Sequence, residues 1–158
     1  MRKILFLDID GVLNSKKYDD ARRFEDGNID VSRLPLVKRI IDETSAEIVL
    51  SSTWRKHWSQ DPDGCDPIGV SLNRLFAEYG LTISDKTPVL DAYDRVQEIR
   101  LWLEAHGNEV KSLAVLDDHR FGWGDLDDYV ARTDFYIGRG LGEAHVEKVI
   151  RVLNRFDE

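Results

Sequence analysis

The 158-residue sequence contains a single cysteine, Cys65. One thiol excludes an intramolecular disulfide, and the paired cysteine motifs of zinc sites are also absent. The apolar run at the N-terminus extends only from Ile4 to Leu7 before Asp8 interrupts it, whereas the apolar core of a signal peptide needs about 7–15 residues. No apolar stretch of the sequence approaches the roughly 18 residues of a membrane span. The single cysteine and the lack of long apolar stretches in the sequence favour a protein of the cytoplasm.

Basic residues are in the minority, with 22 Lys and Arg against 30 Asp and Glu, and the formal net charge is −8. An acidic surface disfavours non-specific binding to nucleic acid or anionic membrane, because phosphate groups attract basic patches. With 42% hydrophobic residues, the chain is long enough to bury a core without disulfides. We therefore expect a single domain over residues 1–158.

Short β-branched runs alternate with longer segments of helical periodicity. The predicted strands are residues 3–8, 47–50, 81–84, 112–120 and a short one at 134–137. The predicted helices are residues 32–44, 70–79, 93–106 and 142–154, with loops at 15–30, 56–66 and 121–131. This alternation predicts a three-layer α/β/α sandwich around a five-stranded parallel, Rossmann-like sheet with right-handed crossovers.

The most informative segment is FLDIDGVLN, residues 6–14, at the end of the first predicted strand. Asp8 and Asp10 are two residues apart, and side chains at i and i+2 of a strand point the same way. Gly11 then lets the backbone turn sharply. One carboxylate of such a pair can attack while the other moves protons, and the pair also invites a divalent cation. The plainer interpretation is a polar strand end with an Asp-Gly turn.

Two further predicted strands end in polar side chains. The second runs into Ser51, Ser52 and Thr53, and the fourth runs into Asp117 and Asp118. Because the carboxyl ends of parallel strands share one edge of the sheet, we expect these groups to meet. They suit phosphoryl transfer to a carboxylate nucleophile, with hydroxyls and a basic side chain binding the phosphate oxygens. Hard oxygen ligands without a Cys or His cluster indicate Mg²⁺ as the cofactor.

On these motifs the sequence resembles the haloacid dehalogenase (HAD) superfamily of phosphohydrolases, in its small, nearly capless form, over roughly residues 2–154. FLDIDGVLN matches the first motif of that superfamily, VLSST at 49–53 the second and VLDD at 115–118 the fourth. STWR at 52–55, RVQEIRLWL at 95–103 and the Gly-Leu pair near 140–142 further resemble HAD domains associated with nucleic-acid repair proteins.

The resemblance implies a role for each motif residue. Asp8 would be the nucleophile that forms an aspartyl-phosphate, and Asp10 would protonate the leaving group and then activate water. An acid at position 10 favours phosphate esters over carbon–halogen bonds as substrates. Ser51 would bind a phosphoryl oxygen, with Ser52 and Thr53 as helpers. The residues implied to hold Mg²⁺ are Asp8, Asp10 (through its backbone carbonyl), Asp118 and, in a supporting or shared role, Asp117.

The third motif of the superfamily is a basic residue, for which the sequence offers two candidates. Arg95 begins a predicted helix before the fourth strand, and Lys86 follows the short third strand. An arginine would hold phosphate through two N–H groups, whereas a lysine acts as a point charge. Trp54 and Arg55 are candidates for the mouth of the site, although Trp54 is equally expected as a core or rim aromatic.

The substrate is expected to be a phosphorylated molecule, and the sequence does not determine its chemical class. The segments after Asn14 and between Ser51 and Leu81 are too short for a large cap domain, so a nucleotide, a nucleic-acid end or a phosphoprotein can reach the site. Two other functions stay open, namely a receiver-like signalling domain and a non-catalytic phosphate-binding or interaction domain on the same fold. The order of the acidic and hydroxyl motifs fits the phosphatase better than the receiver.

Overall fold

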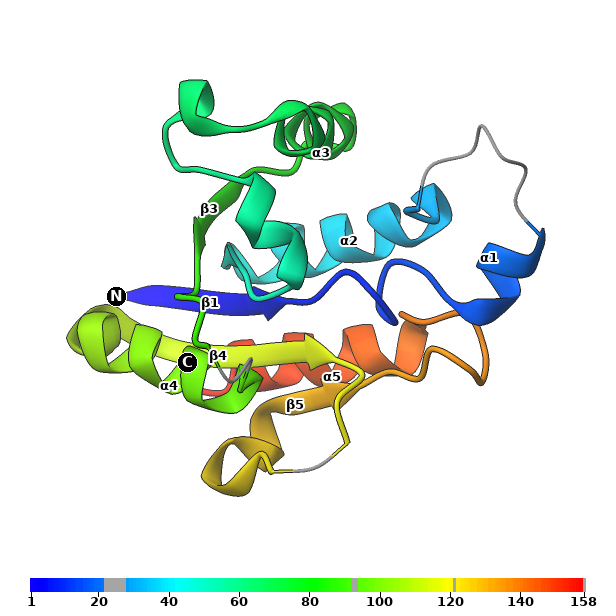
Figure 1. Ribbon diagram of the computed structural model, residues 1–158. Coiled ribbons are helices and arrows are strands. Elements are labelled where there is room, and N and C mark those ends of the chain that lie inside the picture. The colour runs from blue at the N-terminus through cyan, green and yellow to red at the C-terminus, as the bar shows by residue number, and fades with distance from the viewer. Residues whose placement is uncertain (22–27, 92–93, 121, 158) are drawn as a thin grey trace.

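A five-stranded parallel sheet forms the centre of the computed structural model, which describes residues 1–21, 28–91, 94–120 and 122–157 (Figure 1). The strand order is β3-β2-β1-β4-β5, so β1 lies between β2 and β4. All four strand pairs are parallel, as predicted. The strands are β1 (Arg2–Leu7), β2 (Glu47–Leu50), β3 (Ile83–Lys86), β4 (Val110–Asp117) and β5 (Val130–Arg132).

Helices cover both faces of the sheet, because successive side chains of each buried strand point to opposite faces. Leu5 and Leu7 of β1 belong to the core under α2, α3 and α5, while Ile4 and Phe6 belong to the core under α4. The predicted three-layer architecture is therefore confirmed. The helices are α1 (Lys16–Ala21), α2 (Leu34–Thr44), α3 (Pro67–Glu78), α4 (Arg95–His106) and α5 (Glu143–Leu153).

Five short 3₁₀ helices lie between these elements in the described part of the chain: η1 (Val31–Arg33), η2 (Thr53–His57), η3 (Pro62–Gly64), η4 (Gly107–Glu109) and η5 (Gly124–Tyr129). No separate cap domain stands over the sheet within the described ranges. A helix long and apolar enough to cross a membrane is not found among these residues either.

The fifth strand lies earlier in the chain than predicted. Residues 134–137 were expected to form it, but β5 is Val130–Arg132, inside the predicted loop 121–131. Val130 and Ala131 are buried and pair with Val115 and Leu116 of β4. The carboxylate of Asp134 instead accepts hydrogen bonds from the backbone N–H groups that follow at 136 and 137, which is the local bonding of a turn. The prediction missed β5 because its apolar run is only two residues long.

Other predicted bounds differ by a few residues. The third strand is shifted from 81–84 to Ile83–Lys86, and α3 begins at Pro67 rather than at residue 70. Asp66 sets the start of α3, because its carboxylate accepts hydrogen bonds from the first-turn N–H groups of Ile68 and Gly69. The predicted loop 15–30 contains α1, and its residues 22–27 lie outside the described residues, as does residue 93 of the predicted helix 93–106.

A buried ion pair joins the segment after β2 to α4. Arg55 in η2 and Glu98 in α4 are each only 1% exposed, and Arg55 Nη2 lies 2.6 Å from Glu98 Oε2. The same carboxylate oxygen accepts the backbone N–H of Leu90 at 2.8 Å. Burial lowers the pKa of Arg55 below its usual value, and Glu98 opposes that shift. The expectation that Arg55 lines the mouth of the site is therefore wrong, because its guanidinium is a structural group of the core.

Replacing Glu98 with Gln is expected to lower the free energy of unfolding by about 3–5 kcal/mol, because a buried guanidinium is left without its counter-charge. Urea unfolding followed by circular dichroism would measure the change. Glu104→Gln is the matched control, since it makes the same chemical change at an exposed position of the same helix and should cost less than about 0.5 kcal/mol. Similar values for the two variants would contradict the structural role of the pair.

Candidate functional site

Polar side chains gather at the carboxyl ends of the three central strands. Asp8 follows β1, Ser51 follows β2, and Asp117 ends β4. Because β1 pairs with β2 on one side and β4 on the other, this edge is the topological switch point of the sheet, where open α/β folds bind their ligands. The structure thus brings together groups that are far apart in the sequence, as predicted.

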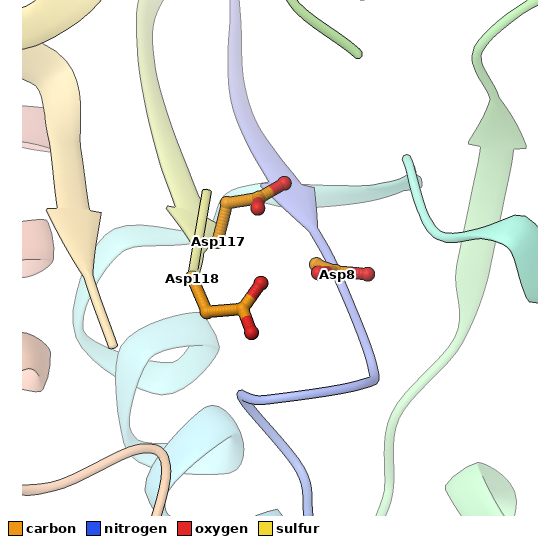
Figure 2. Close-up of side chains that lie close together, drawn as sticks. All are labelled: Asp8, Asp117 and Asp118. Atoms are coloured by element: carbon orange, nitrogen blue, oxygen red, sulfur yellow. The ribbon is translucent and has the colours of Figure 1, made fainter. Parts of the chain in front are cut away.

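Three carboxylates form a compact group at this edge (Figure 2). Asp8, Asp117 and Asp118 each offer one oxygen atom, and these atoms all lie within 4.8 Å of one another. Asp8 and Asp117 are buried, and Asp118 is partly exposed. Asp8 Oδ1 accepts the N–H of Ile9 at 2.9 Å, and Asp117 Oδ1 accepts the N–H of His119 at 2.9 Å.

The crowding of negative charge shows in the pKa values of these carboxyls. Burial, followed by repulsion from Asp117, raises the pKa of Asp8 to about 8, although Arg95 acts against the shift. Burial and Asp117 also raise the pKa of Asp118. A cation that binds all three carboxylates would relieve the same repulsion that a proton relieves here.

Arg95 is the basic residue at the carboxylate group. The Asp94 carboxylate caps α4 by accepting the N–H of Gln97, and Arg95 follows at the first position of the helix. Its Nη1 lies 2.6 Å from Asp117 Oδ2 and 3.2 Å from Asp8 Oδ2. Burial alone would lower the pKa of Arg95, but the two carboxylates raise it above its usual value.

Lys86, the rival candidate, is engaged elsewhere. Its Nζ donates hydrogen bonds to the backbone carbonyls of Arg55 at 3.2 Å and of Trp58 at 2.6 Å. These contacts hold η2 against the end of β3. Of the two predicted basic residues, the structure therefore brings only Arg95 to the carboxylates.

The three hydroxyl residues after β2 have different surroundings. Ser51 is fully buried, and its N–H donates to the carbonyl of Leu7 at 3.0 Å, but its Oγ has no hydrogen-bond partner among the described residues. Ser52 Oγ accepts the N–H of Trp54 and so caps η2. Thr53 is exposed on the rim. A buried hydroxyl without a partner is costly, and Thr87 Oγ1 is a second such hydroxyl among the described residues. Ser51 follows β2 beneath the cleft at the carboxylates and is not one of the residues that line it.

Asp10 lies at the exposed side of the site, outside the three-carboxylate group. Its Oδ1 accepts a hydrogen bond from Asn14 Nδ2 at 2.9 Å, while Asn14 Oδ1 accepts the N–H of Gly11 at 2.8 Å. The buried Asn14 was not predicted as a site residue, although it closes the FLDIDGVLN segment. Its two hydrogen bonds join the Asp10 side chain to the backbone of Gly11 in the turn after β1.

Gly11 is required by close contact as well as by its backbone conformation. Its φ is +84°, and a Cβ at this position would lie 2.2 Å from Asp118 Oδ2. The carbonyl of Gly11 accepts a hydrogen bond from the buried hydroxyl of Thr133 at 2.6 Å. The first and fourth motifs are thus packed against each other, with no room for a larger residue between them.

Two adjoining clefts open at this edge. The carboxylate cleft, of about 730 Å³, is lined by residues that include Asp8, Arg95 and Asp118. The apolar cleft, of about 1070 Å³, lies next to it between the segment 28–31, η2 and α3. Asp10 and Thr53 line both clefts. Trp54 is one wall of the apolar cleft and also packs against the core.

The ligand groups present fit a hard divalent cation such as Mg²⁺. All the ligand atoms are carboxylate oxygens, and no cysteine or histidine belongs to the group in the described residues. One guanidinium faces three carboxylates, so the site keeps an excess of negative charge. The guanidinium of Arg95 and the hydroxyl of Ser51 are donors of the kind that bind phosphate oxygens.

Comparison with curated proteins and with solved structures finds no match. A comparison with protein-family models matches residues 4–146 to a family described as the HAD domain in Swiss Army Knife RNA repair proteins. The matched residues span β1 to α5 and hence the whole edge that carries the carboxylates. The chain therefore belongs to this family of HAD domains.

Proposed function

We propose that this chain is a Mg²⁺-dependent phosphomonoesterase, a single cytoplasmic domain that works through an aspartyl-phosphate on Asp8. The observation that carries the proposal is the buried group of Asp8, Asp117 and Asp118 with Arg95 against it. Membership of the HAD family supports a hydrolase of phosphate esters. The single thiol, Cys65, suits a reducing compartment.

In the first step a carboxylate oxygen of Asp8 forms a bond to phosphorus as the bond to the ester oxygen breaks. Asp10 gives its proton to the leaving oxygen, which departs as an alcohol. Arg95 and the hydroxyl of Ser51 bind the phosphoryl oxygens and stabilise the charge that develops there. Ser52 and Thr53 have lesser parts, since Ser52 Oγ caps η2 and Thr53 lies at the rim.

In the second step Asp10, now ionised, takes a proton from water as the water oxygen attacks phosphorus. The bond to Asp8 breaks, phosphate leaves and both carboxyl groups return to their starting state. The residues that would hold Mg²⁺ are Asp8, Asp118 and Asp117, together with the backbone carbonyl of Asp10. The cation supplies the charge neutralisation that lets an anionic nucleophile approach an anionic phosphate.

The substrate is proposed to be a phosphate monoester that reaches an open site. The family is described by its occurrence in RNA repair proteins, which supports a nucleotide or a nucleic-acid end over a phosphoprotein. The net charge of −8 disfavours extended, non-specific contacts with the nucleic-acid backbone.

Replacing Asp8 with Asn is expected to lower the Mg²⁺-dependent hydrolysis of 4-nitrophenyl phosphate by about 10⁴-fold or more, because the nucleophile is lost. Release of nitrophenolate, with and without Mg²⁺, measures the effect. Asp42→Asn, at an exposed position on α2, is the control and should keep wild-type turnover. Full activity of the Asp8→Asn protein would refute the covalent mechanism.

Replacing Ser51 with Ala is expected to lower kcat/KM by about 10²–10³-fold, because one donor to the phosphoryl oxygen is lost. Its free energy of unfolding should stay within about 0.5 kcal/mol of the wild type, since Ser51 Oγ has no partner to lose among the described residues.

Ser112→Ala is the matched control for this experiment. Ser112 is also buried, but its hydroxyl donates to the carbonyl of Leu153 at 2.6 Å, away from the site. It should lose about 1 kcal/mol of stability and keep its activity. If Ser51→Ala lost stability in proportion to activity, a direct role in phosphate binding would be wrong.

Mg²⁺ is expected to stabilise the folded protein more at pH 8 than at pH 5. The pKa of Asp8 is raised from 3.8 to about 8 by burial, so the proton on folded Asp8 contributes stability that is complete below about pH 4 and is lost as the pH rises through about 8. Mg²⁺ must displace this proton at low pH but not at high pH.

Thermal unfolding with and without Mg²⁺ measures the difference. At roughly 100 times its Kd the cation would add about 2.7 kcal/mol, or roughly 5–10 °C in Tm, at pH 8. Asp118→Asn should abolish most of this shift. Equal Tm shifts at both pH values in the wild type would show that the cation does not compete with a proton at these carboxylates.

A further inference from the structure

The apolar cleft beside the carboxylates has no part in the chemistry described so far. Its volume of about 1070 Å³ is slightly above the ~300–1,000 Å³ typical of ligand clefts. Asp10 and Thr53 are common to this cleft and to the carboxylate cleft. The two clefts therefore adjoin each other, and their border lies at the group proposed to protonate the leaving oxygen.

The shared border at Asp10 determines how a bound substrate is oriented across the two clefts. When the phosphate lies among Asp8, Arg95 and Ser51, the ester oxygen lies at Asp10. The organic part of the ester then extends from Asp10 into the apolar cleft. This step rests on the proposed function, because it uses the role of Asp10 as the proton donor.

The walls of the apolar cleft favour a flat, uncharged group. Ile68 and Leu72 of α3 and Trp54 of η2 provide apolar and aromatic surface. Ile68 is 47% exposed in the structure, so a ligand that covered it would remove apolar surface from water. Flat rings gain further from stacking on an aromatic side chain such as Trp54.

The charges at the apolar cleft disfavour a second phosphate there. The described residues that line it include Asp10, Asp30 and His57 but no lysine or arginine. Arg33 Nε lies 3.8 Å from Asp30 Oδ2, so it is Asp10 that would repel a phosphate in this cleft, whereas ring N–H and amino groups could donate hydrogen bonds to Asp10. The cleft is thus suited to one nucleoside and not to a run of nucleotides.

The shape of the ester decides between a nucleoside and a phenol. In phosphotyrosine the ring is bonded directly to the ester oxygen, so it would fill only the part of the cleft next to Asp10. A nucleotide has a sugar between the ester oxygen and the base, which carries the base toward Ile68 and Trp54. We infer that the apolar cleft binds the nucleoside of a nucleoside monophosphate or of a terminal nucleotide, with its base against these two residues.

The wall formed by α3 is built in place rather than created by the ligand. Gly69 allows α3 to approach η2 closely, because a Cβ on Gly69 would lie 2.0 Å from the carbonyl oxygen of His57. The N–H of Asp66 donates to the same carbonyl at 3.2 Å. Ile68 is therefore held at a fixed place relative to Trp54, which makes the pair suitable for selecting a ligand.

The test compares kcat/KM for adenosine 3′-monophosphate and adenosine 5′-monophosphate with that for glycerol phosphate and phosphotyrosine. One of the two nucleotides should exceed both other esters by about tenfold or more, since a well-fitted pocket gains factors of this size. Ile68→Ser should lower the ratio of nucleotide to glycerol phosphate by about tenfold. Val70→Ser, at a similarly exposed position of α3 outside the cleft, should leave the ratio unchanged.

Several results would overturn the inference while the phosphomonoesterase stands. One is an Asp8-dependent kcat/KM for glycerol phosphate that equals the value for either nucleotide. Another is a kcat/KM for phosphotyrosine tenfold above that for the nucleotides. A third is an equal effect of Val70→Ser and Ile68→Ser on the ratio of nucleotide to glycerol phosphate. If no ester is hydrolysed, the proposed function fails, and the cleft is tested by ligand-observed NMR with adenosine. Binding that Ile68→Ser removes and Val70→Ser keeps would support the nucleoside site, and no binding would refute it.

Discussion

The burial of two carboxylates at the ends of adjacent strands is the constraint on which the site depends. Asp8 follows β1, Asp117 ends β4, and both contact the guanidinium of Arg95. Burying a charge is expensive unless it is paired, and here one positive charge serves three carboxylates. Burial, followed by repulsion from Asp117, raises the pKa of Asp8. A site with too few positive charges is stabilised by a bound proton or cation. The excess negative charge that costs stability is therefore also the feature that would bind the cation of the proposed mechanism.

The surrounding polar contacts hold this arrangement in position. Arg55 Nη1 donates to the backbone carbonyls of Ser51 and Ser52 at 3.0 and 2.8 Å, and Arg55 Nη2 pairs with Glu98 of α4. The segment that carries Ser51, the proposed phosphate-binding hydroxyl, is thereby tied to the helix that carries Arg95. Catalytic donors act best when their positions are fixed before the substrate arrives. The buried ion pair would serve that purpose in the proposed mechanism.

The sequence allowed the sheet and its acidic edge to be predicted because both depend on local patterns. Apolar runs give the central strands, and the polar residues that follow them must lie at the shared carboxyl edge. The short β5 could not be predicted, since two buried residues carry too little periodicity to outweigh the Gly- and Asp-rich surroundings.

The choice between Arg95 and Lys86 and the burial of Arg55 depend on long-range packing. The backbone carbonyls that bind the Lys86 ammonium belong to η2 and to Trp58, the residue after it, and Glu98 meets Arg55 across 43 positions of sequence. Neither contact leaves a local signal. The three hydroxyls after β2 are equivalent in sequence, and only the fold separates the unpartnered Ser51 from the helix-capping Ser52. The spacing of motifs thus identifies the candidate side chains, while long-range packing determines which of them lie at the carboxylates and which have structural contacts.

The position of Asp10 connects the proposed proton transfer with the proposed binding of the organic part of the substrate. Its carboxylate accepts a hydrogen bond from Asn14, and Asp10 lines both the carboxylate cleft and the apolar cleft. A proton donor must lie within hydrogen-bond reach of the leaving oxygen, and the organic group is bonded to that oxygen on the side away from phosphorus. No cap domain lies over the sheet among the described residues, so the walls at Asp10 are those of the two clefts. In the proposed function, η2 and α3, the elements that follow the second motif, would contact the organic part of the substrate.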